Sequence, residues 1–202
     1  MLDPQRYPWV CGVVWWQGYN DDAIQTELRK GRKKNQRMPW IKRIYGRDNI
    51  CSSKVFALEI CPYHSRQWRF AANDGCILNF VKSNVFEPAI KAVQENGLPF
   101  AVGVGREISI MLDNLNNDGV RLEQKWSCVI RDGERVLSNN DLNDCWPRKQ
   151  NGEFVIRSYR LYAMGTGRIL VTWAPGGNTA PKSSFNGIEE KIRNYSNDNP
   201  LQ

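Results

Sequence analysis

PFAVGVGREISIMLDNL, residues 99–115, is the stretch that decides the fold. The apolar run 99–105 predicts a short buried strand, and the apolar residues of 106–115 recur at helical spacing. The strand therefore passes through glycine directly into a helix, which is the geometry that brings backbone amides close to a ligand in α/β proteins. We expect a strand–helix unit that belongs to a larger sheet.

Similar units flank this stretch on both sides. Strands are predicted at 10–16, 54–60 and 168–173, and helices at 23–30, 85–96 and 187–195. Residues 154–164 fit a strand or a helix equally well. Strands that alternate with helices predict a single α/β domain over residues 1–195. The continuous apolar run of 54–60 is typical of a strand buried on both faces, which favours a mostly parallel sheet.

Two segments are predicted to lie outside this alternation. Residues 116–152 turn polar and are expected to be an insertion on the domain, in which Asp132-Gly133 predicts a hairpin that joins 128–130 to 136–137. Residues 196–202 are expected to form a flexible tail.

The composition is that of an ordinary globular protein, with 41% apolar and 24% charged residues in a chain of 202. No apolar stretch reaches the roughly 18 residues of a membrane span, and the first residues do not resemble a secretory signal. We therefore expect a cytoplasmic protein without a membrane partner. The six cysteines are scattered without the spacing of metal ligands, so they are expected to be reduced, mostly buried thiols, and neither a metal nor a cofactor is expected.

The net charge of +7 comes from one basic segment, residues 29–47. It holds nine lysines and arginines and no acidic residue, whereas the rest of the chain carries 19 basic and 21 acidic residues. Charge runs often form solvated loops, but Trp40 and Tyr45 interrupt this one, and cations interleaved with aromatic rings predict a phosphate-binding surface. Lys33, Lys34, Arg37 and Trp40 are the candidates for phosphate contacts and for a surface on which a base can stack.

Ligands of parallel sheets bind beyond the carboxyl ends of the strands. The segments that follow the four predicted strands are 17–22, 61–65, 103–105 and 174–178. They are polar or rich in glycine and proline, so a ligand site is predicted at this edge. Gly103 and Gly105 lack the third glycine of a dinucleotide fingerprint, and a tight packing turn is the favoured interpretation of that segment.

The order of these motifs, with Pro62-Tyr63-His64-Ser65 after a buried strand, resembles the uracil-DNA glycosylase superfamily and especially its small members that carry this tetrapeptide. The resemblance implies a three-layer α/β/α sandwich around a short, mostly parallel central sheet. It implies DNA rather than RNA as the preferred partner. It also implies hydrolysis of the N-glycosidic bond of a modified or deaminated base, without a metal or a cofactor.

The resemblance further assigns roles to single residues. In the glycosylases the loop after the first strand carries the residue that activates water or stabilises charge, and here that loop holds Asn20, Asp21 and Asp22, which also suit the cap of the following helix. Cleavage develops positive charge on the sugar and negative charge on the base, which places Asp21 or Asp22 near the sugar and His64 near the base. The further expected nucleic-acid contacts are Gln17, Tyr63, Ser65, Gly176, Gly177 and Asn178.

Two other functions stay open. The loop after the last predicted strand has no histidine, where the glycosylases usually have one, and this difference favours a non-catalytic module, regulatory or defence-related, that binds nucleic acid or a nucleotide. The third candidate is an inhibitor whose basic segment engages an acidic protein.

Overall fold

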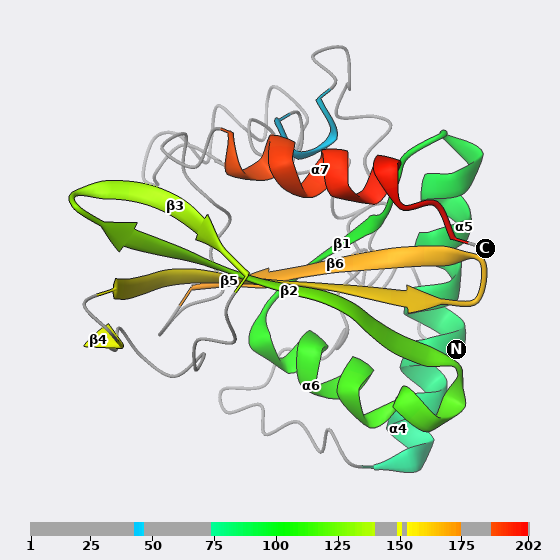
Figure 1. Cartoon of the computed structure of the whole chain (residues 1–202). Helices are drawn as coiled ribbons and strands as arrows, with labels where there is room; N and C mark the ends of the chain where they lie inside the picture. The colour runs from blue at the N-terminus through cyan, green and yellow to red at the C-terminus, as the bar shows by residue number, and fades with distance from the viewer. Residues whose placement is uncertain (1–42, 47–73, 140–148, 151–152, 175–186, 202) are drawn as a thin grey trace, which may run out of the picture.

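The computed structural model describes residues 43–46, 74–139, 149–150, 153–174 and 187–201. These residues form one sheet of six strands with helices on both of its faces (Figure 1). The strands are β1 (Ala101–Val104), β2 (Val120–Arg131), β3 (Glu134–Ser138), β4 (Lys149–Gln150), β5 (Glu153–Met164) and β6 (Gly167–Trp173). The main helices are α4 (Gly75–Val81), α5 (Glu87–Glu95), α6 (Arg106–Asn114) and α7 (Ile188–Asp198), and a π-helical turn (Lys82–Phe86) joins α4 to α5.

The sheet mixes both strand directions. The strand order is β1-β6-β5-β2-β3, with β4 paired to β5. β1 and β6 are parallel, and the other four pairings are antiparallel. The described part of the sheet is therefore mostly antiparallel and does not confirm the prediction of a mostly parallel sheet, whereas the α/β class holds. The physical reason is that short turns join β2 to β3 and β5 to β6, and a short turn can only join antiparallel neighbours.

The stretch 99–115 folds as predicted, with β1 leading into α6. An added Cβ at Gly103 would lie 3.1 Å from two carbons of Ile108, so glycine allows α6 to fold back closely on its own strand. Gly105, with φ of 141°, makes the turn and donates its N–H to the carbonyl of Thr172 at 3.1 Å. The interpretation of these glycines as a packing turn is confirmed.

Residues 120–138 belong to the sheet itself rather than to an insertion on it. The predicted hairpin is present, with Cys128 opposite Leu137 and a turn at Asp132 and Gly133, whose φ angles are 51° and 81°. Positive φ at both turn residues is the type I′ geometry that matches the twist of the strands. Trp126 is buried in the core. The polar composition comes from residues 121–125, which are exposed or only partly buried, whereas residues 126–129 are all buried.

The two faces of β6 pack against different helices, and all seven of its residues are buried. Ile169, Val171 and Trp173 lie in one core cluster with residues of α4, α5 and α6. Leu170 lies in a second cluster with Ile188 and Ile192 of α7. Figure 1 shows α7 on one side of the sheet and α4 and α6 on the other. The continuous apolar run that predicted a strand at 168–173 thus reflects helices on both faces of β6.

The C-terminal end of the described chain is fixed to the sheet. α7 extends to Asp198, beyond the predicted helix end at 195. Arg168 donates Nη1–H to the carbonyl of Ser196 at 3.1 Å and Nη2–H to the carbonyl of Asn199. The prediction of a flexible tail is corrected as far as Asn199. The buried guanidinium of Arg168 donates to the carbonyls of Ser196 and Asn199 and so holds this end of the chain.

Candidate functional site

The residues predicted to carry the chemistry lie outside the described residues. These are Gln17, Asn20, Asp21, Asp22, Lys33, Lys34, Arg37, Trp40, Tyr63, His64, Ser65, Gly176, Gly177 and Asn178.

The carboxyl ends of β1 and β6 meet at one edge, which is where a ligand site was predicted. Val104 pairs in parallel register with Thr172, and Gly105 bonds to the same residue. Two of the four predicted edge segments, 103–105 and the start of 174–178, are therefore direct neighbours. This edge is the candidate functional site of the described chain.

A buried polar cluster lies under α7 at this edge. Its members are Arg43, Cys128, Arg157, Tyr159, Thr172 and Glu189. Arg157 in β5 donates Nη1–H to Thr172 Oγ1 at 2.9 Å, and that hydroxyl donates to the carbonyl of Ser158 at 3.0 Å. Arg157 is 2% exposed, which is rare for an arginine and requires strong polar partners.

Glu189, in the first turn of α7, carries the only acidic side chain of this polar cluster. The carboxylate is 1% exposed and lies 3.7 Å from Nη2 of Arg43. Burial raises its pKa above the ordinary value of 4.5, while its own backbone amide, Arg43 and Arg157 act in the opposite direction. Burial likewise lowers the pKa of Arg157, which nearby Glu189 partly offsets.

The cysteine and tyrosine of the cluster stay protonated. Burial raises the pKa of the Cys128 thiol to about 12 and the pKa of Tyr159 well above its usual value. A thiol must lose its proton to act as a nucleophile, so Cys128 is a core residue rather than a reactive group. Cys76, the other cysteine in the described residues, is also a free thiol but is exposed, unlike the buried thiols that we expected.

A second polar network lies on the opposite face and joins α6 to β5. Arg160 donates Nη1–H to Asp113 Oδ2 at 2.8 Å and to Ser109 Oγ at 3.1 Å. Tyr162 donates to Asp113 Oδ1 at 2.9 Å, and burial raises its pKa to about 12. The guanidinium of Arg160 also lies 5.3 Å from the ring centre of Trp173. The network fixes the rotation of α6 against β5, whose neighbour β6 ends at the candidate edge.

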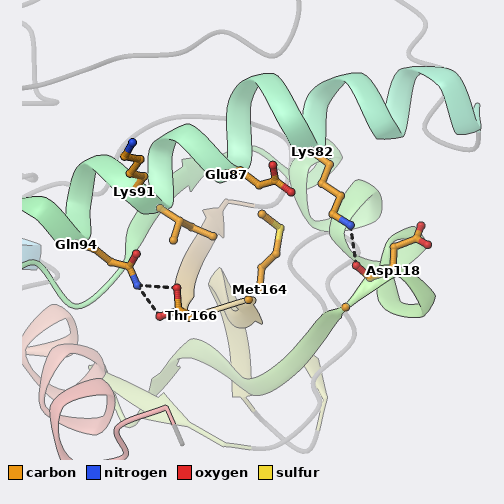
Figure 2. A pocket seen from close by; sticks show the side chains of 10 residues that line it. Lys82, Glu87, Lys91, Gln94, Asp118, Met164 and Thr166 are labelled. Carbon is orange, nitrogen blue, oxygen red and sulfur yellow. Dashed lines mark hydrogen bonds between the residues drawn. The ribbon is translucent and has the colours of Figure 1, made fainter.

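A groove of about 550 Å³ lies at the opposite end of β6, beside the turn to β5 (Figure 2). Gln94 donates to the carbonyl of Thr166 at 2.5 Å, and Lys82 donates to the carbonyl of Asp118 at 2.8 Å. Figure 2 shows Glu87 and Met164 between these two bonded pairs. The groove is lined by α5 and by two turns of the sheet. The length of β6 separates it from the candidate edge.

Within the described ranges, no cluster of three or more histidine, cysteine, aspartate or glutamate side chains is arranged to bind a metal ion. None of the helices in the same ranges combines the length and apolar character needed to cross a membrane. Comparison of the chain with protein-family models, with curated proteins and with solved structures finds no match.

The members of the polar cluster were not predicted from the sequence. Arg157 stands in the run FVIRSYRLYAM, and a charge within a run of apolar and aromatic residues is the signal that could have indicated it. Glu189 follows Ile188 at the start of a helix, where an acidic residue is expected for the helix dipole alone. Arg43 was assigned to the basic segment, but its guanidinium points to Glu189.

The raised pKa of Glu189 predicts a pH dependence of stability. A carboxyl with a raised folded-state pKa stabilises the fold fully below pH 4.5 and loses this contribution as the pH rises through the folded value. The free energy of unfolding of the wild type, minus that of Glu189→Gln, should therefore fall as the pH rises and then level off. Urea unfolding between about pH 4 and pH 8 measures this difference. Exposed Glu190→Gln is the control, and a difference that grows with pH would contradict the assignment.

Proposed function

We propose that the chain is a cytoplasmic nucleic-acid-binding protein of the uracil-DNA glycosylase type, which holds DNA across the carboxyl edge of β1 and β6. The observation that carries the proposal is the ion pair between Arg43 and Glu189. It attaches the last part of the basic segment 29–47 to α7 beside this edge. A cationic segment whose described residues, 43–46, are attached beside a strand-end site suits a ligand with a long phosphate backbone.

The finer fold proposal is a three-layer α/β/α sandwich with a parallel centre. Helices on both faces of β6 support the layers, and the parallel pairing of β1 with β6 supports the centre. β1 ends the path of the described strands. We propose that the strands predicted at 10–16 and 54–60 extend the parallel part beyond β1, which would bring their following loops to the same edge.

The proposed chemistry is hydrolysis of an N-glycosidic bond in a modified or deaminated base. Asp21 or Asp22, with Asn20, would act at the sugar, and His64 at the base. The other predicted contacts at the edge would hold the flipped nucleotide. The non-catalytic module uses the same edge and the same basic segment, so binding and cleavage need separate tests.

Binding is tested with short labelled oligonucleotides at several salt concentrations. The affinity for DNA falls as salt rises, and each lost phosphate contact makes the slope of log affinity against log salt shallower by about 0.9. The double variant Lys33→Ala and Lys34→Ala should therefore have a slope that is shallower by about 2. Lys91→Ala combined with Arg121→Ala removes the same charge from exposed side chains elsewhere and should leave the slope unchanged. Equal slopes for both pairs would contradict a contact role for the basic segment.

Cleavage is tested on single- and double-stranded oligonucleotides that contain uracil, hypoxanthine or alkylated bases. Alkali-labile breaks that disappear in Asp21→Asn or Asp22→Asn would establish the glycosylase. Bound but intact DNA would establish the non-catalytic module. If neither binding nor cleavage is seen, nucleotides and acidic proteins become the partners to test.

A further inference from the structure

Residues 43–46 form a short helical turn, here called the anchor turn, that packs against α7. Ile44 is fully buried in the core cluster that contains Ile188 and Ile192. Tyr45 donates its hydroxyl to the carbonyl of Phe100 at 2.9 Å, immediately before β1. The anchor turn therefore contacts both α7 and the segment that starts the parallel pair of strands.

Two arginine contacts complete this attachment. Arg43 pairs with Glu189 at 3.7 Å, and its carbonyl accepts Nη1–H of Arg193 at 3.1 Å. The guanidinium of Arg193 lies over Gly46, where an added Cβ would be 2.4 Å from Nη1. Gly46 also has φ of 62°, which other residues adopt at a cost. The position of the anchor turn is thus specified from both of its ends.

We infer that the anchor turn is a positioning element for nucleic-acid binding, and that Arg43 and Glu189 act by holding it rather than by touching phosphate. The inference rests on the proposed function. Arg43 belongs to the basic segment by sequence, but its side chain is 21% exposed and faces a carboxylate that is 1% exposed. A cation neutralised in this way contributes little to a phosphate-binding surface. Instead, the ion pair of Arg43 with Glu189 holds the anchor turn, through which the basic segment joins the described fold.

Loss of the contact between Arg43 and Glu189 should measurably lower the affinity for DNA. Fixing the backbone of one residue costs about as much free energy as a tenfold change in affinity. If the attachment is broken, DNA binding must also fix the anchor turn in place. We therefore expect Glu189→Gln to bind DNA about tenfold more weakly than the wild type at the same salt concentration, with an unchanged salt slope.

The matched control is Glu190→Gln, at the exposed neighbour in α7. Both substitutions raise the net charge by one, so both increase the general attraction to a polyanion equally. Only Glu189→Gln removes the partner of Arg43. The control should bind at least as tightly as the wild type, and equal affinities of the two variants would overturn the inference.

Arg43→Gln separates a positioning role from a contact role. If Arg43 touches phosphate, its loss lowers the salt slope by about 0.9. If it only holds the anchor turn, the slope is unchanged and the double variant with Glu189→Gln binds no more weakly than either single variant. A lower slope, or additive losses, would overturn the inference.

Gly46→Ala weakens the other contact of the anchor turn without changing any charge, because the added Cβ displaces the guanidinium of Arg193 from the carbonyl of Arg43 and the residue must keep a positive φ. It should lower the affinity for DNA in the same way, and circular dichroism with thermal unfolding identifies any variant that fails to fold. Wild-type protein that binds no DNA would remove the proposed function and this inference together. Wild-type binding that is unaffected by folded Glu189→Gln and Gly46→Ala would remove only the inference.

Discussion

Glu123→Leu is expected to lower the free energy of unfolding by about 3–5 kcal/mol, because it leaves the charge of Arg168 buried without its carboxylate. The carboxylate of Glu123 accepts Nε–H of Arg168 at 2.5 Å and Nη2–H at 3.3 Å. Both side chains are at most 10% exposed. Desolvation of a guanidinium is costly, and the fold tolerates it here only with this carboxylate and the two carbonyls at the end of α7.

Urea unfolding of the variant measures this effect, and Arg121→Ala is its control. Arg121 also pairs with Glu123, at 3.4 Å, but its side chain is 73% exposed, so its loss should cost about 0.5 kcal/mol or less. Adding Arg168→Met to Glu123→Leu should restore part of the stability, since the unpaired charge is gone. A double variant less stable than Glu123→Leu would show that the buried charge is not the cause.

Gly167→Ala is expected to lower the free energy of unfolding by about 2–3 kcal/mol through overpacking. An added Cβ would lie 2.1 Å from Cγ2 and 3.3 Å from Cβ of Ile90, in the helix that covers the start of β6. Neither atom is the far end of a flexible side chain. The strand or α5 must therefore shift, and Gln94, which holds the adjoining turn, must shift with it.

Thermal and urea unfolding test this prediction with two comparisons. Gly75→Ala places its Cβ in open space within α4 and should be neutral or slightly stabilising. Ile90→Leu removes the Cγ2 methyl at nearly constant volume, so adding it to Gly167→Ala should recover part of the loss. The collision is not the cause if Ile90→Leu brings no recovery.

The elements that the sequence predicted correctly depend on local patterns. The strand–helix stretch 99–115, the Asp132-Gly133 hairpin and the strand at 168–173 each carry their turn residues and periodicity within a short window. The helix at 85–96 was also correct as α5 (Glu87–Glu95). α4 was missed, although Asp74 accepts the N–H groups of Cys76 and Ile77 and marks its start as an N-cap.

The pairing of strands and the members of the polar cluster could not be predicted in the same way. Buried strands have continuous apolar runs in parallel sheets, but β6 shows that helices on both faces produce the same run next to an antiparallel neighbour. Arg193 and Arg43, which bond to each other, are 150 residues apart in sequence. Contacts at such distances leave no periodic signal. Since the predicted catalytic residues lie outside the described residues, their assignment stays a prediction.

The docking of the anchor turn on α7 has a consequence for the order in which the protein can fold during synthesis. Ile44 is made about 150 residues before its neighbours in α7. A ribosome that adds about 5–20 residues per second needs about 8–30 s to cover this distance. For that time Ile44 lacks the residues of α7 that bury it. The core cluster that contains Ile44 is therefore completed only after α7 has been made, long after Ile44 itself.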